Sequence, residues 1–475
     1  MQKEYLNLEL GEKANNGNYM LAVFHLVPEE GMDLLDAASE VAAESSTGSN
    51  LRVGTATPFA DALDALVYKV DKEKNLVWIA YPWRIFDRGG NIQNIMTFIA
   101  GNVFGMSEIK ACKLLDVWFP REMLDQYDGP NYTIDDMRKY LNVYDRPILG
   151  TIIKPKIGLS NGEYAEVCYN FWSGGGDFVK NDEPQADQDF CPYYKMVDDI
   201  RKAMDRAEAE TGNTKVHSFN ISAPDFDTMK ERADYIVKKM KPGSYAFLVD
   251  GITAGWMAVQ TVRRLYPNVY LHFHRAGHGA MTRDENPIGY TVLVLSKFAR
   301  LAGASGVHTG TAGIGKMAGS IDEDITSARM ILADKYMGHS FEQNWYGMKK
   351  CNPIVSGGLN PTKLKPYADA LGNVDFVTTM GGGVHSHPGG TTAGAKALVQ
   401  ACEAWKKGVT IEEYAKDHVE LQQAIDFYGQ KNEGKEASVP SPVQAAPTTP
   451  TPATPTIAPQ IPATEPTPGT IPPMV

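Results

Sequence analysis

The stretch DFVKNDE, residues 177–183, joins a short apolar run directly to a charged end. The same design, an apolar run that reads as a strand before a loop and a helical pattern, recurs in eight segments: 147–153, 177–180, 216–222, 245–251, 269–275, 306–310, 352–358 and 375–383. Eight strand–helix units in one continuous stretch predict a TIM (β/α)8 barrel. A doubly wound parallel sheet is the alternative, but that fold rarely needs eight such units.

The chain on either side of this stretch has a different character. Before it, strand-like runs at 21–28, 65–71 and 75–83 surround a helical pattern at 31–46, which predicts a smaller α+β domain. After it, from Glu436 to Val475, proline, threonine and alanine dominate, so a disordered or polyproline-II tail is expected. The predicted division is an N-terminal domain at 1–135, a barrel at 136–435 and a tail at 436–475.

Composition limits the class of protein. The formal net charge of −11 argues against nucleic acid as the main partner, because binding to a phosphate backbone needs a clustered basic excess. The five cysteines form no CxxC pair, which indicates reduced thiols rather than disulfides or a zinc site. The N-terminal stretch lacks the apolar run of a signal peptide, and no apolar run is long enough to span a bilayer. We therefore expect a cytoplasmic protein with no membrane partner.

Polar residues follow most of the predicted strands, at the end where barrel enzymes place their active sites. Lys180, Asp182 and Glu183 follow the second strand. Two neighbouring carboxylates suit Mg²⁺, and a lysine that has reacted with CO2 to form a carbamate would add a further oxygen ligand. The alternative is a surface charge cluster held by a salt bridge, which the position at a strand end disfavours.

Lysines and histidines at other strand ends could move protons. Lys154 and Lys156 follow the first strand, where a lysine could exchange protons in an apolar pocket or act as a point charge beside a phosphate, and the residues alone leave both interpretations open. His272, His274 and His278 follow the fifth strand and could include a general base or metal ligands. A structural role is the usual alternative, and we keep it for His272.

Several groups are suited to binding an anion. The guanidinium group of Arg275 matches a phosphate bidentately. The glycine-rich segments SGGLN (356–360) and GGGVHSHPGG (381–390) expose backbone N–H groups where barrels commonly bind a phosphate. Lys316 lies in TAGIGKMAG (311–319), which predicts a mobile lid with the lysine at its tip, a flexible surface loop being the alternative.

These motifs occur together, in this order, in one known family. The segments GTIIKPKIGLS, GGGDFVKNDEPQ, HFHRAGHGA, GVHTGT with GIGK, and IVSGG closely resemble the large subunit of ribulose-1,5-bisphosphate carboxylase/oxygenase (RuBisCO). The resemblance extends over nearly the whole chain before the tail. The segments KNDEPQ and HRAGHGA look more like form II, or the archaeal II/III group, than like the plant type. That likeness implies a homodimer or larger homo-oligomer without a small subunit.

The resemblance implies a reaction: the carboxylation, with competing oxygenation, of D-ribulose 1,5-bisphosphate to give two molecules of 3-phosphoglycerate. Carbamylated Lys180 would remove the proton from the third carbon, and Asp182 and Glu183 would complete the Mg²⁺ site that holds the resulting enediolate. The required small molecules are then ribulose 1,5-bisphosphate, CO2 and O2, with one further CO2 forming the carbamate.

The resemblance also assigns roles to the remaining residues. Lys154 would protonate a product carbanion, Lys316 would stabilise the carboxylated intermediate, and His274 would assist proton transfer. The implied substrate-binding residues in the barrel are Lys156, Arg275, His308, Ser356, Gly357, Gly358, Gly381 and Gly382.

In this family the N-terminal domain of a partner subunit completes the active site. AAESSTG supplies Glu44 for that role and GNVFG supplies Asn102. The sequence departs from the plant type at Ser49 and Asn50, where the plant type has threonine and tryptophan. The serine keeps a hydroxyl that can bind a phosphate, and the asparagine is similar to form II.

Two other functions fit the residues less well. A RuBisCO-like enolase or isomerase acting on a sulfur-containing sugar phosphate would share the fold, the carbamate and Mg²⁺. Such proteins usually lose part of the residue set that is intact here. A catalytically silent scaffold that docks partners through the proline-rich tail is disfavoured by the same intact set.

Overall fold

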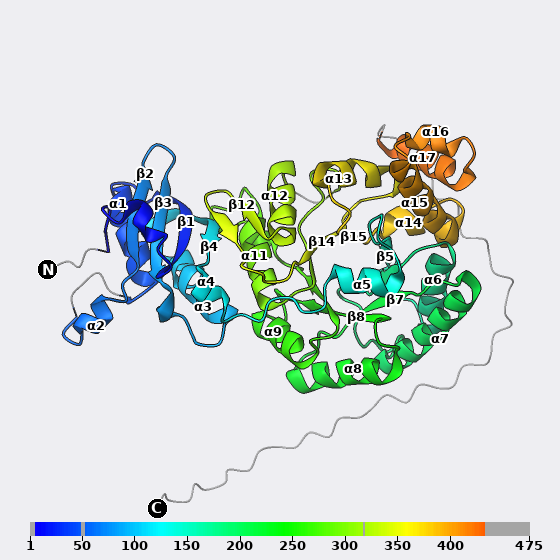
Figure 1. Cartoon of the computed structure of the whole chain (residues 1–475), viewed down its shortest axis with the longest axis horizontal. Coiled ribbons are helices and arrows are strands. Elements are labelled where there is room, and N and C mark those ends of the chain that lie inside the picture. The colour runs from blue at the N-terminus through cyan, green and yellow to red at the C-terminus, as the bar shows by residue number, and fades with distance from the viewer. Residues whose placement is uncertain (1–4, 49–52, 317–318, 433–475) are drawn as a thin grey trace, which may run out of the picture.

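The computed structural model describes residues 5–48, 53–316 and 319–432 (Figure 1). The predicted tail and the departures at Ser49 and Asn50 lie outside the described residues. Within those residues, no helix is long and apolar enough to cross a membrane.

The centre of the described chain is a parallel barrel. Its eight strands are hydrogen-bonded in the order β15-β14-β11-β9-β8-β7-β6-β5. Their bounds are β5 Gly150–Ile152, β6 Phe178–Lys180, β7 Val216–Asn220, β8 Tyr245–Asp250, β9 Tyr270–His274, β11 Gly306–His308, β14 Asn352–Val355 and β15 Val377–Thr378. The two edges of the sheet meet through a parallel bridge between Ile148 and Val377. All eight predicted strands are present, so the prediction of a TIM barrel is confirmed and an open doubly wound sheet is excluded.

Helices surround this barrel on the outside (Figure 1). They are α6 Asn161–Ser173, α7 Tyr193–Thr211, α8 Phe226–Lys239, α9 Trp256–Leu265, α11 Val292–Ala302, α12 Ile321–Leu332, α13 Leu364–Leu371 and α15 Gly390–Lys406, with the short helices α10 Gly279–Thr282 and α14 Gly382–His385 and the C-terminal helices α16 Ile411–Ala415 and α17 Val419–Asn432. Local sequence fixes their starts. At α6, for example, Ser160 accepts the Glu163 N–H while the Glu163 carboxylate accepts the Ser160 N–H at 2.8 Å, which is a complete capping box.

Helix α5, Ile134–Leu141, covers the amino end of the barrel. Its buried side chains Ile134, Met137 and Leu141 form one cluster with strand residues that include Ile148 and Phe178. The helix therefore packs with the barrel although it crosses the predicted boundary between residues 135 and 136. The division of the chain into three parts stays a prediction.

The N-terminal domain is built on an antiparallel sheet, which confirms the α+β prediction. Its own strands are β1 Tyr19–Pro28, β2 Leu66–Asp71, β3 Leu76–Pro82 and β4 Ile109–Trp118, with helices α1 Leu34–Glu44, α2 Pro58–Asp61, α3 Ile92–Ile99 and α4 Arg121–Leu124. A fifth strand, β10 Ile288–Tyr290, comes from the barrel part of the chain and pairs with β4 in parallel. A small hairpin of β12 Lys335–Met337 and β13 Glu342–Asn344 lies after α12. The sequence predicted neither β4 nor this hairpin.

Candidate active site

A buried lysine and two carboxylates meet at the carboxyl end of β6. Lys180 is the last residue of that strand, and both Lys180 and Asp182 are 1% exposed. Lys180 Nζ lies 3.8 Å from Glu183 Oε2. Burial lowers the pKa of Lys180 to about 8, although the two carboxylates act in the opposite direction. A usable fraction of the amine is therefore neutral near pH 7, and only the neutral amine can attack CO2.

The two carboxylates are balanced by lysines from the loop after β5. Lys154 forms an ion pair with Asp182. Lys156 Nζ lies 3.0 Å from Glu183 Oε1 and 3.5 Å from Asp182 Oδ1. Burial raises the pKa of Asp182, and the neighbouring Glu183 carboxylate adds to this shift because a nearby negative charge disfavours ionisation.

These residues fit a magnesium ion. A divalent cation would relieve the repulsion between Asp182 and Glu183, and both side chains offer the oxygen ligands that Mg²⁺ prefers. Among the described residues, no group of three His, Cys, Asp or Glu side chains could hold a metal ion. A carbamate on Lys180 would add a third oxygen ligand to these two carboxylates.

His274, the last residue of β9, lies beside the carboxylates. Its Nε2 is 3.5 Å from Glu183 Oε2, and its Nδ1 is 3.4 Å from Asp250 Oδ1. Burial lowers the pKa of His274, so the ring is neutral near pH 7 and can accept a proton.

A second set of polar side chains crosses the barrel interior. His272 Nε2 and His308 Nε2 are 2.9 Å apart, and His308 Nδ1 lies 3.1 Å from Ser356 Oγ. The other ring nitrogen of His272 lies 3.4 Å from Ser218 Oγ. Burial lowers the pKa of both histidines well below the ordinary value, so the row is uncharged. The structure thus brings His308 and Ser356 together and places His272 between His308 and Ser218, and the structural role of His272 stays a prediction.

The predicted glycines lie where backbones approach closely. Lys316 N–H donates to Gly357 O at 2.9 Å, and a Cβ added at Gly358 would lie 2.7 Å from Lys316 Cγ. A Cβ added at Gly381 would lie 3.1 Å from Lys154 Cε, and Gly382 begins α14. The glycines therefore allow Lys316 and Lys154 to rest against the ends of β14 and β15. Residues 317 and 318 lie outside the described residues, and the predicted lid stays a prediction.

Arg275 is a buried cation with spare hydrogen-bonding capacity. The residue is 8% exposed, and within the described residues its Nη1 atom has no hydrogen-bond partner. Burial lowers its pKa to about 10, while Asp324 and Glu323 oppose that shift. His278, by contrast, is engaged with the Thr282 hydroxyl at 2.6 Å. A buried guanidinium N–H group without a partner suits a phosphate oxygen.

Asp324 is a site residue that the sequence analysis missed. It lies in the first turn of α12, is 3% exposed, and accepts the Ala312 N–H at 2.8 Å. Ala312 has a left-handed backbone with φ +53°. A Cβ added at Gly310 would overlap the Asp324 carboxyl group, and one added at Gly319 would lie 3.0 Å from it. Asp324 therefore contacts both ends of the loop that carries Lys316, and the acidic run at residues 322–324 was its signal in the sequence.

Glu44 and Asn102 lie in the N-terminal domain and contact each other. Asn102 Nδ2 donates to Glu44 Oε1 at 3.0 Å. For the described residues, no hydrogen bond or ion pair joins either side chain to the barrel site. Helix α1, which ends at Glu44, lies on the part of the N-terminal domain away from the barrel (Figure 1). The structure thus pairs these two predicted residues but does not bring them to the site of the same chain.

Comparisons with known proteins agree with this arrangement. A family model described as ribulose bisphosphate carboxylase large chain, N-terminal domain, matches residues 4–123, and the catalytic-domain model of the same large chain matches residues 133–428. The chain belongs to the RuBisCO large-chain family. It is 43% identical over 433 residues to the ribulose bisphosphate carboxylase of Rhodobacter capsulatus, covering 89% of this chain and 94% of that protein. The enzyme of Rhodopseudomonas palustris strain HaA2 is 43% identical over 437 residues, with the same coverage.

Solved RuBisCO structures share the fold. The dimeric archaeal RuBisCO of Hyperthermus butylicus superposes with a TM-score of 0.80 at 36% identity, covering 87% of this chain and 96% of that one. The octameric enzyme of Pyrococcus horikoshii OT3 gives a TM-score of 0.82 at 34% identity, covering 90% and 98%.

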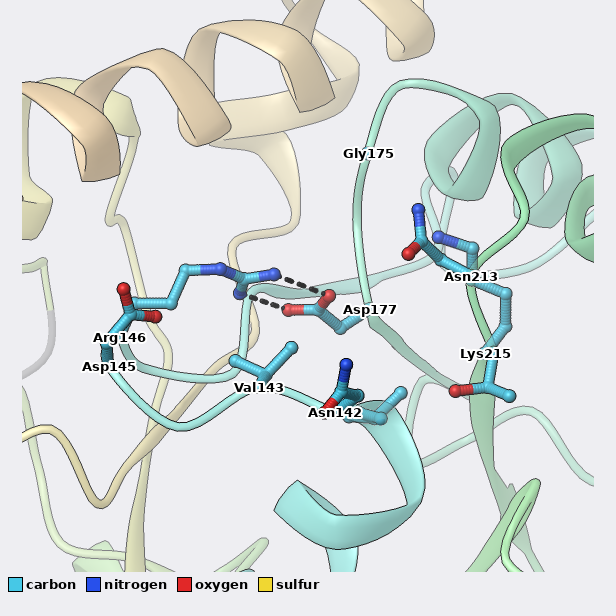
Figure 2. Close-up of a pocket in the computed structure, with 10 residues that line it drawn as sticks. Asn142, Val143, Asp145, Arg146, Gly175, Asp177, Asn213 and Lys215 are labelled. Atoms are coloured by element: carbon cyan, nitrogen blue, oxygen red, sulfur yellow. Dashed lines mark hydrogen bonds and ion pairs between the residues drawn. The ribbon is translucent and has the colours of Figure 1, made fainter.

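A pocket at the opposite end of this RuBisCO barrel contrasts with the active site. It has a volume of about 220 Å³ and is lined by Leu141, Asn142, Val143, Asp145, Arg146, Gly175, Asp177, Asn213, Thr214 and Lys215. Figure 2 shows the Arg146 guanidinium group facing the Asp177 carboxylate, with N–O distances of 2.5 and 2.9 Å. Lys215 Nζ donates to Gly176 O at 2.9 Å. These charges are matched within the protein, which favours a structural role for the pocket.

Proposed function

We infer that this protein is a ribulose bisphosphate carboxylase, which adds CO2 to ribulose 1,5-bisphosphate and splits the product into two molecules of 3-phosphoglycerate. One observation carries the inference: the buried amine of Lys180 lies beside Asp182 and Glu183 at the carboxyl end of β6. The chain around that site is 43% identical to a ribulose bisphosphate carboxylase over 89% of its length. Oxygenation of the same substrate would compete with carboxylation.

Activation of the enzyme would begin at Lys180. Its neutral amine would attack CO2 and lose a proton, so that the side chain ends in an anionic carbamate. Asp182, Glu183 and the carbamate would hold Mg²⁺, which when bound supplies a Lewis acid for the substrate oxygens. The carbamate is also the base that would take the proton from the third carbon of the substrate.

Residues around Lys180 would then guide the later steps. Lys154 forms an ion pair with Asp182, and it would protonate the carbanion of one product. His274 would assist proton transfer, and its two nitrogens face Glu183 and Asp250. Lys316 would stabilise the negative charge that develops on the carboxylated intermediate.

The remaining residues would bind the substrate. Arg275 offers an unpaired guanidinium N–H group to a phosphate oxygen. Backbone N–H groups of the glycine-rich segments would do the same, and the substrate hydroxyls would reach His308 and Ser356. The full proposed set of barrel residues for binding is Lys156, Arg275, His308, Ser356, Gly357, Gly358, Gly381 and Gly382.

The active assembly we propose is a homodimer, or a larger homo-oligomer of dimers, without a small subunit and located in the cytoplasm. The Glu44–Asn102 pair supports a shared site, because it makes no described contact with the barrel site of its own chain. We place the protein with form II or the archaeal II/III group, on the segments KNDEPQ and HRAGHGA.

The decisive experiment is incorporation of labelled bicarbonate into 3-phosphoglycerate after preincubation with bicarbonate and Mg²⁺. We expect activity that depends on the preincubation and that falls by at least about 10³-fold in Lys180→Ala, since the base and a metal ligand are lost together. Lys195→Ala, in α7 with its side chain 67% exposed, is the matched control and should retain activity. Absence of product from well-folded protein would overturn the carboxylase and favour the enolase or isomerase.

A further inference from the structure

The turn between β12 and β13, residues 338–341, is held by a residue of the N-terminal domain. Asp116, on β4, accepts the N–H groups of Ser340 at 3.0 Å and Phe341 at 3.1 Å through Oδ2. A Cβ added at Gly338 would overlap the same carboxylate, so the turn packs directly against Asp116. The hairpin position is therefore tied to β4 rather than to the barrel alone.

Asp116 is itself fixed by a buried ion pair. Its Oδ1 lies 2.6 Å from Lys297 Nζ, and both side chains are completely buried. Lys297 also donates to Val117 O at 2.6 Å. A buried pair whose hydrogen bonds are satisfied cannot shift without leaving an unpaired charge in the protein interior, which is strongly destabilising. Asp116 is thus a rigid support for the turn.

The same turn reaches the helix behind the Lys316 loop. His339 Nε2 lies 2.5 Å from Glu323 Oε2, and the other oxygen of Glu323 accepts the Leu293 N–H at 2.9 Å. Glu323 raises the pKa of His339 through this hydrogen bond, with Asp116 acting in the same direction and Lys297 in the opposite one. Glu323 is next in sequence to Asp324, which contacts both ends of the Lys316 loop.

We propose that His339 is a positioning residue that couples the N-terminal domain to the loop carrying Lys316. The coupling is a continuous series of contacts from β4 through the hairpin turn to the first turn of α12. It requires no contact between His339 and substrate. The proposal rests on the role inferred above for Lys316, and it adds that the placement of Lys316 depends on the N-terminal domain of the same chain.

Proton removal and carboxylation can be measured separately, and comparing them distinguishes a positioning role of His339 from a general loss of structure. Removal of the third-carbon proton needs the carbamate on Lys180, whereas stabilisation of the carboxylated intermediate needs Lys316. In His339→Ala we expect the kcat for carboxylation to fall about tenfold, because a small displacement of a catalytic group is costly. Exchange of the third-carbon proton with solvent should stay within about twofold of the parent enzyme.

Two variants serve as matched controls. His339→Gln keeps an N–H donor for Glu323, and it should retain most of the carboxylation. Lys335→Gln removes an ion pair to Glu342 of 2.7 Å that stays within the hairpin, and it should leave both half-reactions unchanged.

Specific outcomes would overturn the proposal. An unchanged kcat in His339→Ala would show that His339 does not couple the N-terminal domain to the Lys316 loop. An equal loss of proton exchange and carboxylation would show that His339 has only a structural role. Equal damage in Lys335→Gln would assign the effect to the hairpin in general. Failure of the parent enzyme to exchange the proton would instead point to failure of the proposed function itself.

Discussion

The two ends of the barrel carry similar residues in opposite states. At the amino end, Arg146 is matched by Asp177 in a bidentate pair, and Lys215 donates to a backbone carbonyl. At the carboxyl end, Lys180 is buried with its nearest carboxylate oxygen 3.8 Å away, and one nitrogen of Arg275 has no partner among the described residues. The same kinds of side chain are therefore satisfied at one end and left short of partners at the other.

This difference distinguishes charged residues that stabilise the fold from charged residues that take part in binding and catalysis. Charges with complete partners hold strands together, and their protonation is fixed. Charges that are buried without full compensation have shifted pKa values and bind what the protein itself does not provide, such as CO2, Mg²⁺ or a phosphate. Substitutions at the two ends should consequently have different costs, and three experiments test that expectation in order of decreasing effect.

The largest effect is expected at the amino end. Arg146→Met should lower the free energy of unfolding by about 3–5 kcal/mol, because Asp177 would remain buried without its partner. Carboxylation per folded active site should not change. Urea unfolding and active-site-normalised kinetics measure the two quantities, and the double variant Arg146→Met/Asp177→Asn should recover part of the stability. Loss of activity without loss of stability would break the comparison.

A smaller effect concerns the pH dependence of activation at Lys180. Since the pKa of Lys180 is lowered to about 8, the neutral fraction rises about tenfold per pH unit below that value and levels off above it. The rate of activation by CO2 and Mg²⁺, measured at constant dissolved CO2, should rise about 50-fold from pH 6 to 8, because half of the amine is neutral at the pKa. An activation rate that does not depend on pH would mean that the lowered pKa of Lys180 does not control the rate of carbamate formation.

The smallest effect is expected from Asp324. Burial raises its pKa to about 6 from an ordinary 3.8. Above pH 6 the ionised carboxylate therefore lowers the free energy of unfolding. This effect shrinks between pH 6 and 3.8, and it vanishes below 3.8, where the group is protonated in both folded and unfolded states. Asp324→Asn should therefore raise the free energy of unfolding by about 1–3 kcal/mol at pH 8, and the gain should disappear near pH 4.

The same variant should lower carboxylation, since the Lys316 loop would lose the charge that holds both of its ends. Asp322→Asn, at an exposed position one residue before Glu323, is the matched control and should change neither stability nor activity. If Asp324→Asn instead lowers the free energy of unfolding at pH 8, the Asp324 carboxylate is stabilising, as the paired charges at the amino end of the barrel are.

The sequence predicted the barrel because each strand can be recognised from a few consecutive residues. An apolar run followed by charged or glycine-rich residues marks both the strand and its functional end. That local signal placed Lys180, Asp182 and Glu183 together at one strand end, and the resemblance to the RuBisCO family added His274 to the same site. The folded chain does bring them within contact of one another.

The missed features depend on partners far away in the chain. Strand β4 buries Lys113 and Asp116, although charged residues are usually exposed. Lys113 Nζ donates to the carbonyls of Met281 and Arg283, and Asp116 pairs with Lys297. Asp324 was missed for the same reason, because its contacts with Gly310 and Ala312 appear only when the loop is folded back on α12.

The pairing of β10 with β4 has a consequence for synthesis on the ribosome. The edge of β4 can pair only after residues 288–290 have been synthesised, and these follow the end of β4 by about 170 residues. At ordinary translation rates, this edge therefore stays unpaired for a time on the order of 10–30 s. An unpaired strand edge can recruit another chain, and charged residues such as Lys110 on β4 discourage that encounter. The first domain to leave the ribosome is thus completed only after half of the second has emerged.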